Sequence, residues 1–377
     1  MKNWATPSCT QSEIEGTELR AVERESKSIG IIRVLIVDDS AYVRKVVREM
    51  LGHSPSIEIA GVARDGVEAL QLLETVRPDV VISDLMMPEL DGVGFVRQQM
   101  LRDPIPIIVM SSAEENSEDT IAALDAGAVD FVQKPTALAS EKIFSMRDNL
   151  IETVKVAAAA HPRIVQLPPP PKHSKLPALG RSPSKGAARF DVVVIGISTG
   201  GPQALRYIIP QFPKDFPVPI VIVLHMPVGY TAMYAERLNE IAELDVREAT
   251  GAETIVPGVT LIAPAGKHLI FNRTSGGPVT TRLTSYPETA PHRPSVDVLF
   301  QSAAQVFGER TLGVVMTGMG TDGKTGSAWI KARGGMIFSE SEETCVVYGM
   351  PSAVAEAGLS DKIVRLERMS QAIQEAM

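Results

Sequence analysis

The stretch Val34-Leu35-Ile36-Val37-Asp38-Asp39-Ser40 decides the fold of the first half of this chain. Its four aliphatic residues, followed directly by two carboxylates, predict a buried strand with polar groups at its carboxyl end. Similar aliphatic segments recur, with helix-like stretches between them, at residues 57–59, 80–82, 105–109 and 129–132. Strands that alternate with helices predict right-handed βαβ units, a doubly wound parallel sheet and a ligand site at the carboxyl ends of the strands.

The same alternation returns from Asp191 to the C-terminus. Strand candidates lie at residues 192–197, 220–224, 260–262, 312–316 and 336–338, and a helical pattern covers residues 231–244. No internal repeat in the sequence relates this half to the first. We therefore expect two separate α/β domains, each a doubly wound parallel sheet.

The remaining parts of the chain have the composition of a leader and a linker. Residues 1–30 are rich in charge and show no apolar period, which is typical of a disordered leader. Four consecutive prolines at 168–171 lie in a basic segment, 161–190, that contains no Asp or Glu. We expect a first domain at residues 31–150, a linker at 151–189 and a second domain at 190–377. A solvated spacer is the favoured interpretation of the linker, and contact with an acidic partner is the alternative.

Composition excludes several classes of protein. The formal net charge of −8 argues against nucleic acid as the main partner. No stretch approaches the roughly 18 apolar residues of a membrane span, and the N-terminus lacks a signal-peptide pattern. We expect a cytoplasmic protein without direct membrane insertion. The two cysteines, Cys9 and Cys345, form neither a disulfide framework nor a metal-type pair.

Three carboxylates of the first domain follow predicted strands. Asp38 and Asp39 come after the first strand, and Asp84 comes after the strand at 80–82. Because carboxyl ends of parallel strands meet at one edge, these groups could hold Mg²⁺, which prefers a few carboxylates together with water and phosphate oxygens. One carboxylate could then act as a nucleophile and form an aspartyl phosphate.

Ser111 and Lys134 each end another predicted strand and could contact the phosphoryl oxygens. With them, the region from about 33 to 135 resembles the receiver domain of bacterial response regulators, through Val-Leu-Ile-Val-Asp-Asp-Ser, Ile-Ser-Asp-Leu-Met-Met-Pro-Glu-Leu-Asp-Gly and Val-Gln-Lys-Pro. The resemblance implies a flavodoxin-like fold with Asp84 as phosphoacceptor, Ser111 and Lys134 as switch residues, and Asp38, Asp39 and Asp84 around Mg²⁺.

A serine of the second domain lies where a nucleophile would be expected. Gly196-Ile197-Ser198-Thr199-Gly200 fits a G-x-S-x-G turn between a buried strand and a helix, which exposes the serine hydroxyl beside N–H groups that can stabilise an oxyanion. His225 ends the next strand and could be the general base, although a lone histidine is more often structural. Asp322, in a glycine-rich loop after another strand, is the favoured acid. Asp297 is its rival, but it reads equally well as a capping residue.

The second domain, from about Asp191 almost to the C-terminus, closely resembles the catalytic domain of the CheB family of chemotaxis protein-glutamate methylesterases. The matching stretches include Ile-Gly-Ile-Ser-Thr-Gly-Gly, Leu-His-Met-Pro, His-Arg-Pro-Ser-Val-Asp-Val-Leu-Phe and Met-Thr-Gly-Met-Gly-Thr-Asp-Gly. The resemblance implies a Rossmann-like fold with Ser198 as nucleophile, His225 as base, Asp322 as acid and Met319 as a candidate oxyanion donor. Ile197 stands where the family often has alanine.

What the resemblance implies for function is an adaptation enzyme. It would hydrolyse glutamyl methyl esters, and deamidate certain glutamines, on methyl-accepting chemotaxis receptors through an acyl-enzyme. A chemotaxis histidine kinase would be the phosphodonor, and the esterase domain would need no cofactor. His268 and Arg293 are plausible residues at the rim of the site, with structural roles as the alternative. Two other classes remain open from the residues themselves, namely a phosphorylation-controlled scaffold or transcription regulator and a serine peptidase.

Overall fold

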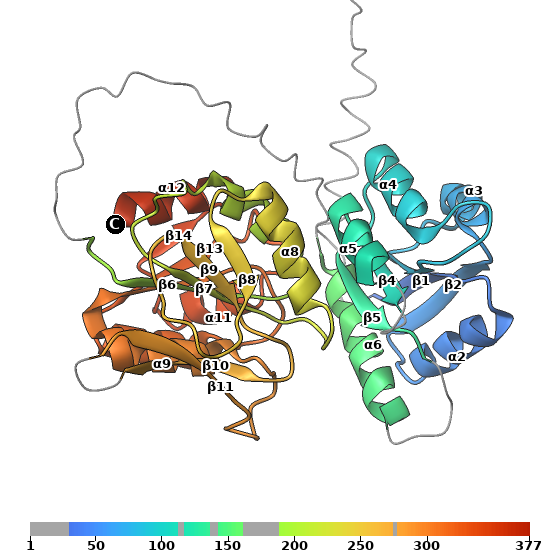
Figure 1. Cartoon of the computed structure of the whole chain (residues 1–377). Coiled ribbons are helices and arrows are strands. Elements are labelled where there is room, and N and C mark those ends of the chain that lie inside the picture. Colours follow the sequence, from blue (N-terminus) through green and yellow to red (C-terminus); the bar gives the residue numbers. More distant parts are fainter. Residues whose placement is uncertain (1–29, 112–116, 136–141, 161–187, 274–276) are drawn as a thin grey trace, which may run out of the picture.

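The computed structural model describes residues 30–111, 117–135, 142–160, 188–273 and 277–377. These residues form two α/β domains, each built on a parallel sheet (Figure 1). A two-stranded antiparallel sheet accompanies the second domain. None of the helices within these ranges is long and apolar enough to span a membrane. The fold class expected from the sequence is confirmed.

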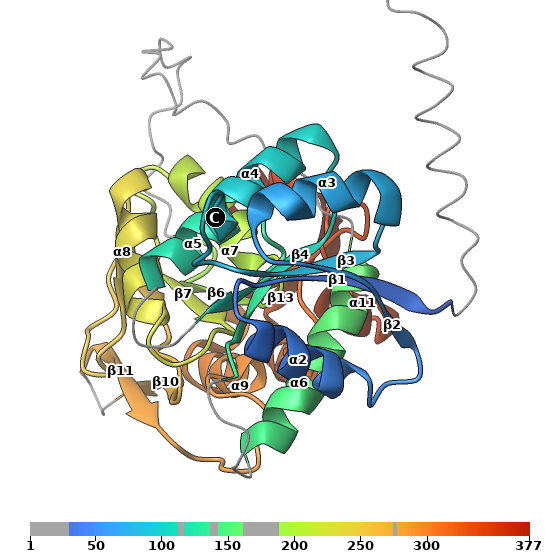
Figure 2. The ribbon, with the colours of Figure 1, turned by 90° about the vertical axis from the view of Figure 1, so that its right-hand side faces the viewer.

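The first sheet has the strand order β2-β1-β3-β4-β5, and all of its pairs are parallel. Its strands are β1 (Ile32–Val37), β2 (Ile57–Ala63), β3 (Val80–Asp84), β4 (Ile107–Ser111) and β5 (Asp130–Gln133). Its helices are α2 (Ala41–Leu51), α3 (Gly66–Val76), α4 (Gly92–Arg102), α5 (Ser117–Ala126) and α6 (Lys142–Ala158). Helices α2 and α6 cover one face, and α3, α4 and α5 cover the other (Figure 2).

Short polar side chains mark where the first three described helices begin. Ser40, Asp65 and Asp91 each precede a helix, and each side chain accepts a hydrogen bond from the backbone N–H three residues further on. Such a cap satisfies one of the N–H groups that a helix start leaves without an intrahelical partner. Helices α2 and α3 begin close to the carboxyl ends of β1 and β2, and α4 begins after the loop that follows Asp84.

The second sheet is also parallel and has the order β14-β13-β12-β6-β7-β9-β8. Its strands are β6 (Val192–Ile197), β7 (Ile220–Leu224), β8 (Asp245–Glu248), β9 (Val259–Ile262), β12 (Thr311–Val315), β13 (Met336–Glu340) and β14 (Lys362–Val364). The antiparallel hairpin is β10 (His268–Arg273) and β11 (Val279–Thr284). Because β6 pairs with both β7 and β12, the loops after these three strands meet at one edge.

The helices of the second domain lie on both faces of its sheet. They are α7 (Gly201–Ile208), α8 (Thr231–Ile241), α9 (Val296–Phe307), α10 (Lys324–Ala332), α11 (Met350–Glu356) and α12 (Leu366–Ala376), with short 3₁₀ turns at Ile209–Gln211 and Gly308–Arg310. Helix α9 packs with Val296, Leu299 and Phe300 in the core, so its N-terminus is held close to the carboxyl edge of the sheet.

Every strand expected from the sequence coincides with an observed one, although the strand expected at 105–109 begins only at Ile107 as β4. The short edge strands β8 and β14 and the β10–β11 hairpin were not expected. The domain limits remain predictions. Residue 150 lies inside α6, and the leader residues 1–29 and the linker residues 161–187 lie outside the described part of the chain.

The two domains pack against each other through α5 and β5 of the first and α7 and α8 of the second (Figure 1). The Gln203 side-chain amide donates to the carbonyl oxygens of Leu124 at 3.1 Å and Ala128 at 3.0 Å, and Arg206 forms an ion pair with Asp125. One cluster of buried apolar side chains is continuous across this interface. The contact therefore combines apolar packing with specific polar pairs.

Candidate active site

Ser198 is the first residue after β6, on a sharp turn into α7. Its backbone N–H donates to the Thr317 carbonyl at 3.0 Å, and its own carbonyl accepts from the Gly201 N–H at 2.7 Å. Gly200 has a φ of 77°, a left-handed conformation that favours glycine. The Ser198 side chain is partly exposed. The turn therefore presents a serine hydroxyl at the carboxyl edge of the sheet, as the sequence pattern predicts.

Gly318 leaves the space that Ser198 occupies. A Cβ atom at Gly318 would lie 2.7 Å from Ser198 Cβ and 2.6 Å from Met350 Sδ. Real Cβ atoms do not approach other atoms so closely, so a larger residue at this position would displace the serine or the loop. The loop after β12 and the Ser198 turn can therefore approach this closely only because Gly318 has no side chain.

His225 follows β7, and its backbone N–H donates to the Ile197 carbonyl at 3.1 Å. Because Ile197 and Leu224 are partners in the β6–β7 register, Ser198 and His225 are the first residues after two neighbouring strands. His225 Nε2 lies 2.9 Å from Asp322 Oδ2, with side chains that are 10% and 8% exposed. Nδ1 is left as the ring nitrogen that can accept a proton. Among the described residues, the Ser198 hydroxyl makes no hydrogen bond to His225 in this conformation.

Asp322 is bound by more donors than His225 alone. Its carboxylate accepts from the backbone N–H groups of Val296 at 2.8 Å and Asp297 at 2.9 Å, and from the Ser295 hydroxyl at 3.0 Å. Burial alone raises its pKa, but the hydrogen bond and charge of His225 and these N–H groups lower the pKa to about 2. Asp322 is therefore an ionised acceptor at neutral pH, held at the N-terminus of α9.

Two backbone N–H groups beside Ser198 are candidates for binding an oxyanion. Within the described residues, the N–H groups of Thr199 and Met319 have no hydrogen-bond acceptor. The loop that carries Met319 is held by its neighbours, since the Thr317 N–H donates to Glu340 Oε2 and the Thr317 hydroxyl donates to the Thr199 carbonyl, both at 3.0 Å. Fixed donors of this kind can stabilise charge that develops on a carbonyl oxygen.

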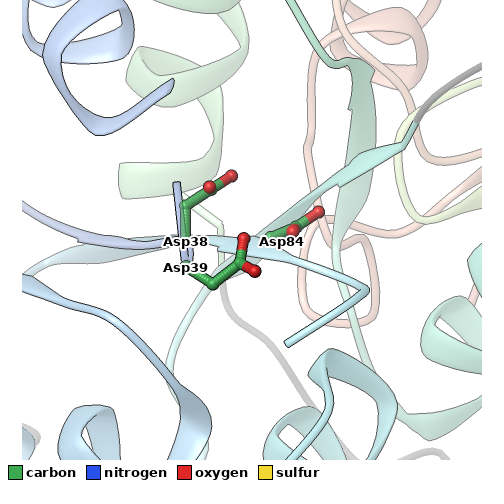
Figure 3. Close-up of side chains that lie close together, drawn as sticks. All are labelled: Asp38, Asp39 and Asp84. Atoms are coloured by element: carbon green, nitrogen blue, oxygen red, sulfur yellow. The ribbon is translucent and has the colours of Figure 1, made fainter. Parts of the chain in front are cut away.

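A second polar site lies at the carboxyl edge of the first sheet. Asp38, Asp39 and Asp84 offer carboxylate oxygens that all lie within 4.8 Å of one another, and Figure 3 shows them gathered where β1 and β3 end. Lys134 Nζ lies 2.7 Å from Asp84 Oδ2 and 3.1 Å from Asp38 Oδ2. Burial lowers the pKa of Lys134, but the bond to Asp84 and the charges of both aspartates outweigh it and raise that pKa overall.

The carboxylate set fits Mg²⁺. Asp38 Oδ2 is buried and accepts no well-aligned hydrogen bond, although Lys134 lies close to it. Burial, followed by the charge of Asp84, raises the pKa of Asp38. A divalent cation would offset this cost by neutralising the buried carboxylates. Oxygen ligands from carboxylates are the ones that Mg²⁺ prefers. A hard divalent ion therefore suits this cluster.

Ser111 connects the carboxylate cluster to the second domain. Its hydroxyl lies 2.9 Å from the Tyr230 hydroxyl, across the interface, and accepts from Thr120 at 2.7 Å. The Tyr230 ring also packs on Phe131 with 4.7 Å between ring centroids. Nearby, the Thr199 hydroxyl donates to Asp130 Oδ2 at 2.6 Å. The first domain thus contacts the residue next to Ser198.

Comparison with known proteins identifies both domains. The model of the CheB methylesterase family matches residues 193–373, and the model of the response regulator receiver domain matches residues 34–144. A protein-glutamate methylesterase/protein-glutamine glutaminase of Myxococcus xanthus is 46% identical over 90% of this chain and 96% of its own length. A namesake from Halalkalibacterium halodurans is 43% identical over 91% of this chain and 97% of its own length.

The chain belongs to the CheB methylesterase family. It carries the receiver domain and the catalytic domain of that family. The crystal structure of the Thermotoga maritima CheB methylesterase catalytic domain is 41% identical, covers 50% of this chain and 99% of its own, and gives a TM-score of 0.49.

Two of the candidate residues, Asp297 and His268, make structural contacts outside the proposed triad. Asp297, the rival acid, accepts from the N–H groups of Gly323 at 2.9 Å and Gly326 at 2.6 Å, so its carboxylate caps the start of α10 rather than meeting His225. For His268 the sequence leaves a rim position and a structural role open, and the structure favours the structural role: its side chain is fully buried, and its Nδ1 accepts from the Ser295 N–H at 3.2 Å. Arg293 is exposed, and its guanidinium donates to the Glu288 carbonyl.

Several residues of this CheB-family site escaped the sequence reasoning. Ser295 and Val296 bind Asp322, but an ordinary helix start carries no signal that its N–H groups serve a distant carboxylate. Tyr230 and Asp130 act across the domain interface, which a single sequence does not specify. His292 stacks on the His225 ring. His292 belongs to the His-Arg-Pro-Ser-Val-Asp motif, but a motif in a loop does not place its side chain.

Proposed function

We propose that this chain hydrolyses glutamyl methyl esters, and deamidates specific glutamines, on chemotaxis receptors through a Ser198-His225-Asp322 triad that phosphorylation of Asp84 activates. The observation that carries the proposal is the 2.9 Å contact between His225 Nε2 and the ionised Asp322, one strand away from the Ser198 turn. The names of the relatives, protein-glutamate methylesterase/protein-glutamine glutaminase, support the substrate class.

The chemistry divides between the three side chains. Ser198 Oγ attacks the ester carbonyl while His225 Nδ1 takes the hydroxyl proton, and Asp322 stabilises the imidazolium that forms. The tetrahedral intermediate then expels methanol, which leaves with the proton held by His225. Water repeats the sequence on the acyl-enzyme, releases the free glutamate carboxylate and restores the serine. An amide substrate follows the same route with ammonia as the leaving group.

Ser198 must turn toward His225 before it can react, because the hydrogen bond between them is not made in this conformation. Catalytic hydrogen bonds are often loose without substrate and tighten in the reacting complex. The backbone positions support such a rotation, since the two residues follow partner positions in adjacent strands. The N–H groups of Thr199 and Met319 would then hold the oxyanion.

In the receiver domain, Asp84 would be the phosphoacceptor and a chemotaxis histidine kinase the donor. Asp38, Asp39 and Asp84 would hold Mg²⁺, which would offset the charge of the carboxylates and of the incoming phosphoryl group. Lys134 already contacts Asp84 and would bind a phosphoryl oxygen. By the limits expected from the sequence, residues 31–150 would form this domain, 151–189 the linker and 190–377 the catalytic domain, and α6 of the first domain continues past its limit to Ala158.

The interface supports a route from Asp84 to the serine turn. Ser111 shares its hydroxyl with Tyr230 of the catalytic domain, so a phosphoryl group that recruits Ser111 would compete with that contact. Asp130 holds Thr199, whose N–H is a proposed oxyanion donor. Loss of these contacts would release the turn and open the edge to a receptor helix. Phosphorylation would therefore shift the pair of domains toward an active state.

The test is methanol release from membranes that contain methylated receptors. Wild type given Mg²⁺ and a phosphodonor is expected to release methanol, and Ser198→Ala is expected to release none above background. A matched control is Ser352→Ala, because Ser352 lies on α11 and bonds Glu356, outside the proposed site. Equal release by wild type and Ser198→Ala would refute the serine mechanism. Receptor binding without release by wild type would indicate a binding module instead.

A further inference from the structure

A second histidine lies against the ring of the proposed base. The imidazoles of His225 and His292 are stacked, with 4.3 Å between ring centroids and 21° between ring planes. His292 belongs to the loop between β11 and α9, and its residue as a whole is exposed at the carboxyl edge of the sheet. Neither the triad chemistry nor the interface described above gives this side chain a role.

The same loop holds the acid of the triad. Three residues after His292, Ser295 bonds Asp322 with its hydroxyl, and Val296 bonds it with its N–H. The segment 292–296 therefore touches the His225–Asp322 pair twice, once at the carboxylate and once at the ring face. A carboxylate at one ring nitrogen restrains the direction of that nitrogen, but it leaves the ring free to tilt about the hydrogen bond. A flat partner on the ring face removes that freedom.

The stack is compatible with a neutral His292. Burial, followed by the charge of His225, lowers the pKa of His292, while the charge of Asp322 acts in the opposite direction. Two imidazolium rings in face-to-face contact would repel each other, whereas a neutral ring can lie against the imidazolium that His225 becomes during the reaction. A lowered pKa favours the neutral ring, so His292 offers His225 an aromatic surface.

We propose that His292 is a positioning residue for His225: its stacked ring holds the imidazole in the orientation in which Nε2 meets Asp322 and Nδ1 can face Ser198. The inference rests on the proposed triad and adds a residue to it. It requires a flat ring at position 292 and does not require a titratable one. His292 forms no bond with the substrate and transfers no proton.

The test compares two substitutions in the full-length chain, activated with Mg²⁺ and a small-molecule phosphodonor. His292→Ala removes the ring and is expected to lower kcat for methanol release about 10-fold while KM changes less than about twofold, because a misoriented base slows chemistry without weakening binding. His292→Phe keeps the flat ring and is expected to restore kcat to within about threefold of wild type. Since His292 lies on the surface, both variants should unfold at the temperature of wild type.

The matched control is His53→Ala, because His53 is an exposed histidine at the end of α2 in the receiver domain. It should leave kcat and KM unchanged. A second readout is the His225 Nε2–H proton signal in NMR, which should be protected from solvent exchange in wild type and His292→Phe and unprotected in His292→Ala.

Three results would overturn the inference. Equal activity of His292→Ala and wild type would show that the stack does nothing for the base, and a rise in KM alone would make His292 a receptor contact. A loss of kcat that Phe does not restore would also contradict a role based on ring shape. Ser198→Ala and His225→Ala separate this failure from failure of the proposed function. If these two variants stay active, the triad itself is wrong. If they are inactive, only the role proposed for His292 is wrong.

Discussion

At the scale of single residues, Asp322 is the proposed acid of the triad. It is ionised with a pKa of about 2, it holds His225, and it joins the loop after β12 to the N-terminus of α9. Its identity as acid was favoured from a glycine-rich loop after a strand, and its rival Asp297 proved to cap α10. Nothing in the sequence indicated the backbone N–H groups of Val296 and Asp297 that also bond Asp322, because every residue except proline carries such a group.

Asp322→Asn should abolish most of the activity. An amide cannot stabilise the imidazolium, and its NH₂ group favours the wrong tautomer of His225, so kcat should fall by roughly 10³–10⁴-fold. Steady-state methanol release measures this. Asp297→Asn is the matched control, because the amide oxygen can still accept from Gly323 and Gly326, and it should keep kcat within about threefold. Equal losses in the two variants would contradict the assignment of the acid.

Glu340 gives a prediction about stability and pH. It is fully buried, it accepts from Thr317 and Thr344, and burial raises its pKa from 4.5 to about 7. Between these two values the unfolded chain is ionised while the folded chain keeps its proton, so the free energy of unfolding falls as pH rises through this window. The full effect is about 3 kcal/mol.

Glu340→Gln should remove this fall in the free energy of unfolding with rising pH, because a side-chain amide of nearly the same shape does not ionise in this range. Urea unfolding at about pH 5 and about pH 8 measures it, and the difference between variant and wild type cancels the other titrating groups. The wild type should lose stability relative to the variant at the higher pH. Parallel changes in the two proteins would mean that Glu340 does not titrate in this range.

At the scale of helices and strands, the sequence predicted the central strands well because they are continuous aliphatic segments, buried on both faces, with polar residues at their carboxyl ends. It missed β8, β14 and the β10–β11 hairpin, whose segments are short or mix polar and apolar residues. The candidate residues Ser198 and His225 were found because each directly follows a strong strand. His292 and Ser295 lie in a loop, where spacing carries little information.

The fit between the β12 loop and the serine turn can be tested at Gly318. A methyl group there would lie within 2.7 Å of Ser198 Cβ and Met350 Sδ, so Gly318→Ala should displace Ser198, the proposed nucleophile. We expect kcat to fall at least about 10-fold and the free energy of unfolding to fall by about 1–3 kcal/mol. Methanol release and urea unfolding measure the two effects. Full activity in this variant would mean that the loop and turn separate before catalysis.

At the scale of the whole molecule, the domain interface is where regulation would act. The switch candidate Ser111 bonds Tyr230, and Asp130 bonds Thr199 next to the proposed nucleophile, so the receiver domain contacts the Ser198 turn and α8 through two polar pairs. The sequence predicted both domains and their order. It could not predict these pairs, because they depend on how two folded bodies dock and not on any local pattern.

Tyr230→Phe should raise the activity of the unphosphorylated enzyme. The ring keeps its contact with Phe131, but the bond to Ser111 is lost, which weakens the closed arrangement by about 1 kcal/mol and raises basal methanol release by roughly 2- to 10-fold. Activity with the phosphodonor should not change.

Tyr234→Phe is the matched control for Tyr230→Phe. Tyr234 lies on α8, and its hydroxyl donates to the Pro202 carbonyl at 2.8 Å inside the catalytic domain, so basal activity should stay at the wild-type level. If the two variants raised basal activity alike, the Ser111 contact would have no special part in holding the domains closed.

The most direct test of the account is covalent labelling of the nucleophile. The full-length chain is treated with an alkyl phosphonofluoridate, with and without Mg²⁺ and a phosphodonor, and the modified peptide is identified by mass spectrometry. The account predicts a single label on Ser198, formed faster with the phosphodonor and absent from His225→Ala. A label on another serine that accompanies loss of methanol release, or active enzyme with Ser198 fully modified, would contradict it.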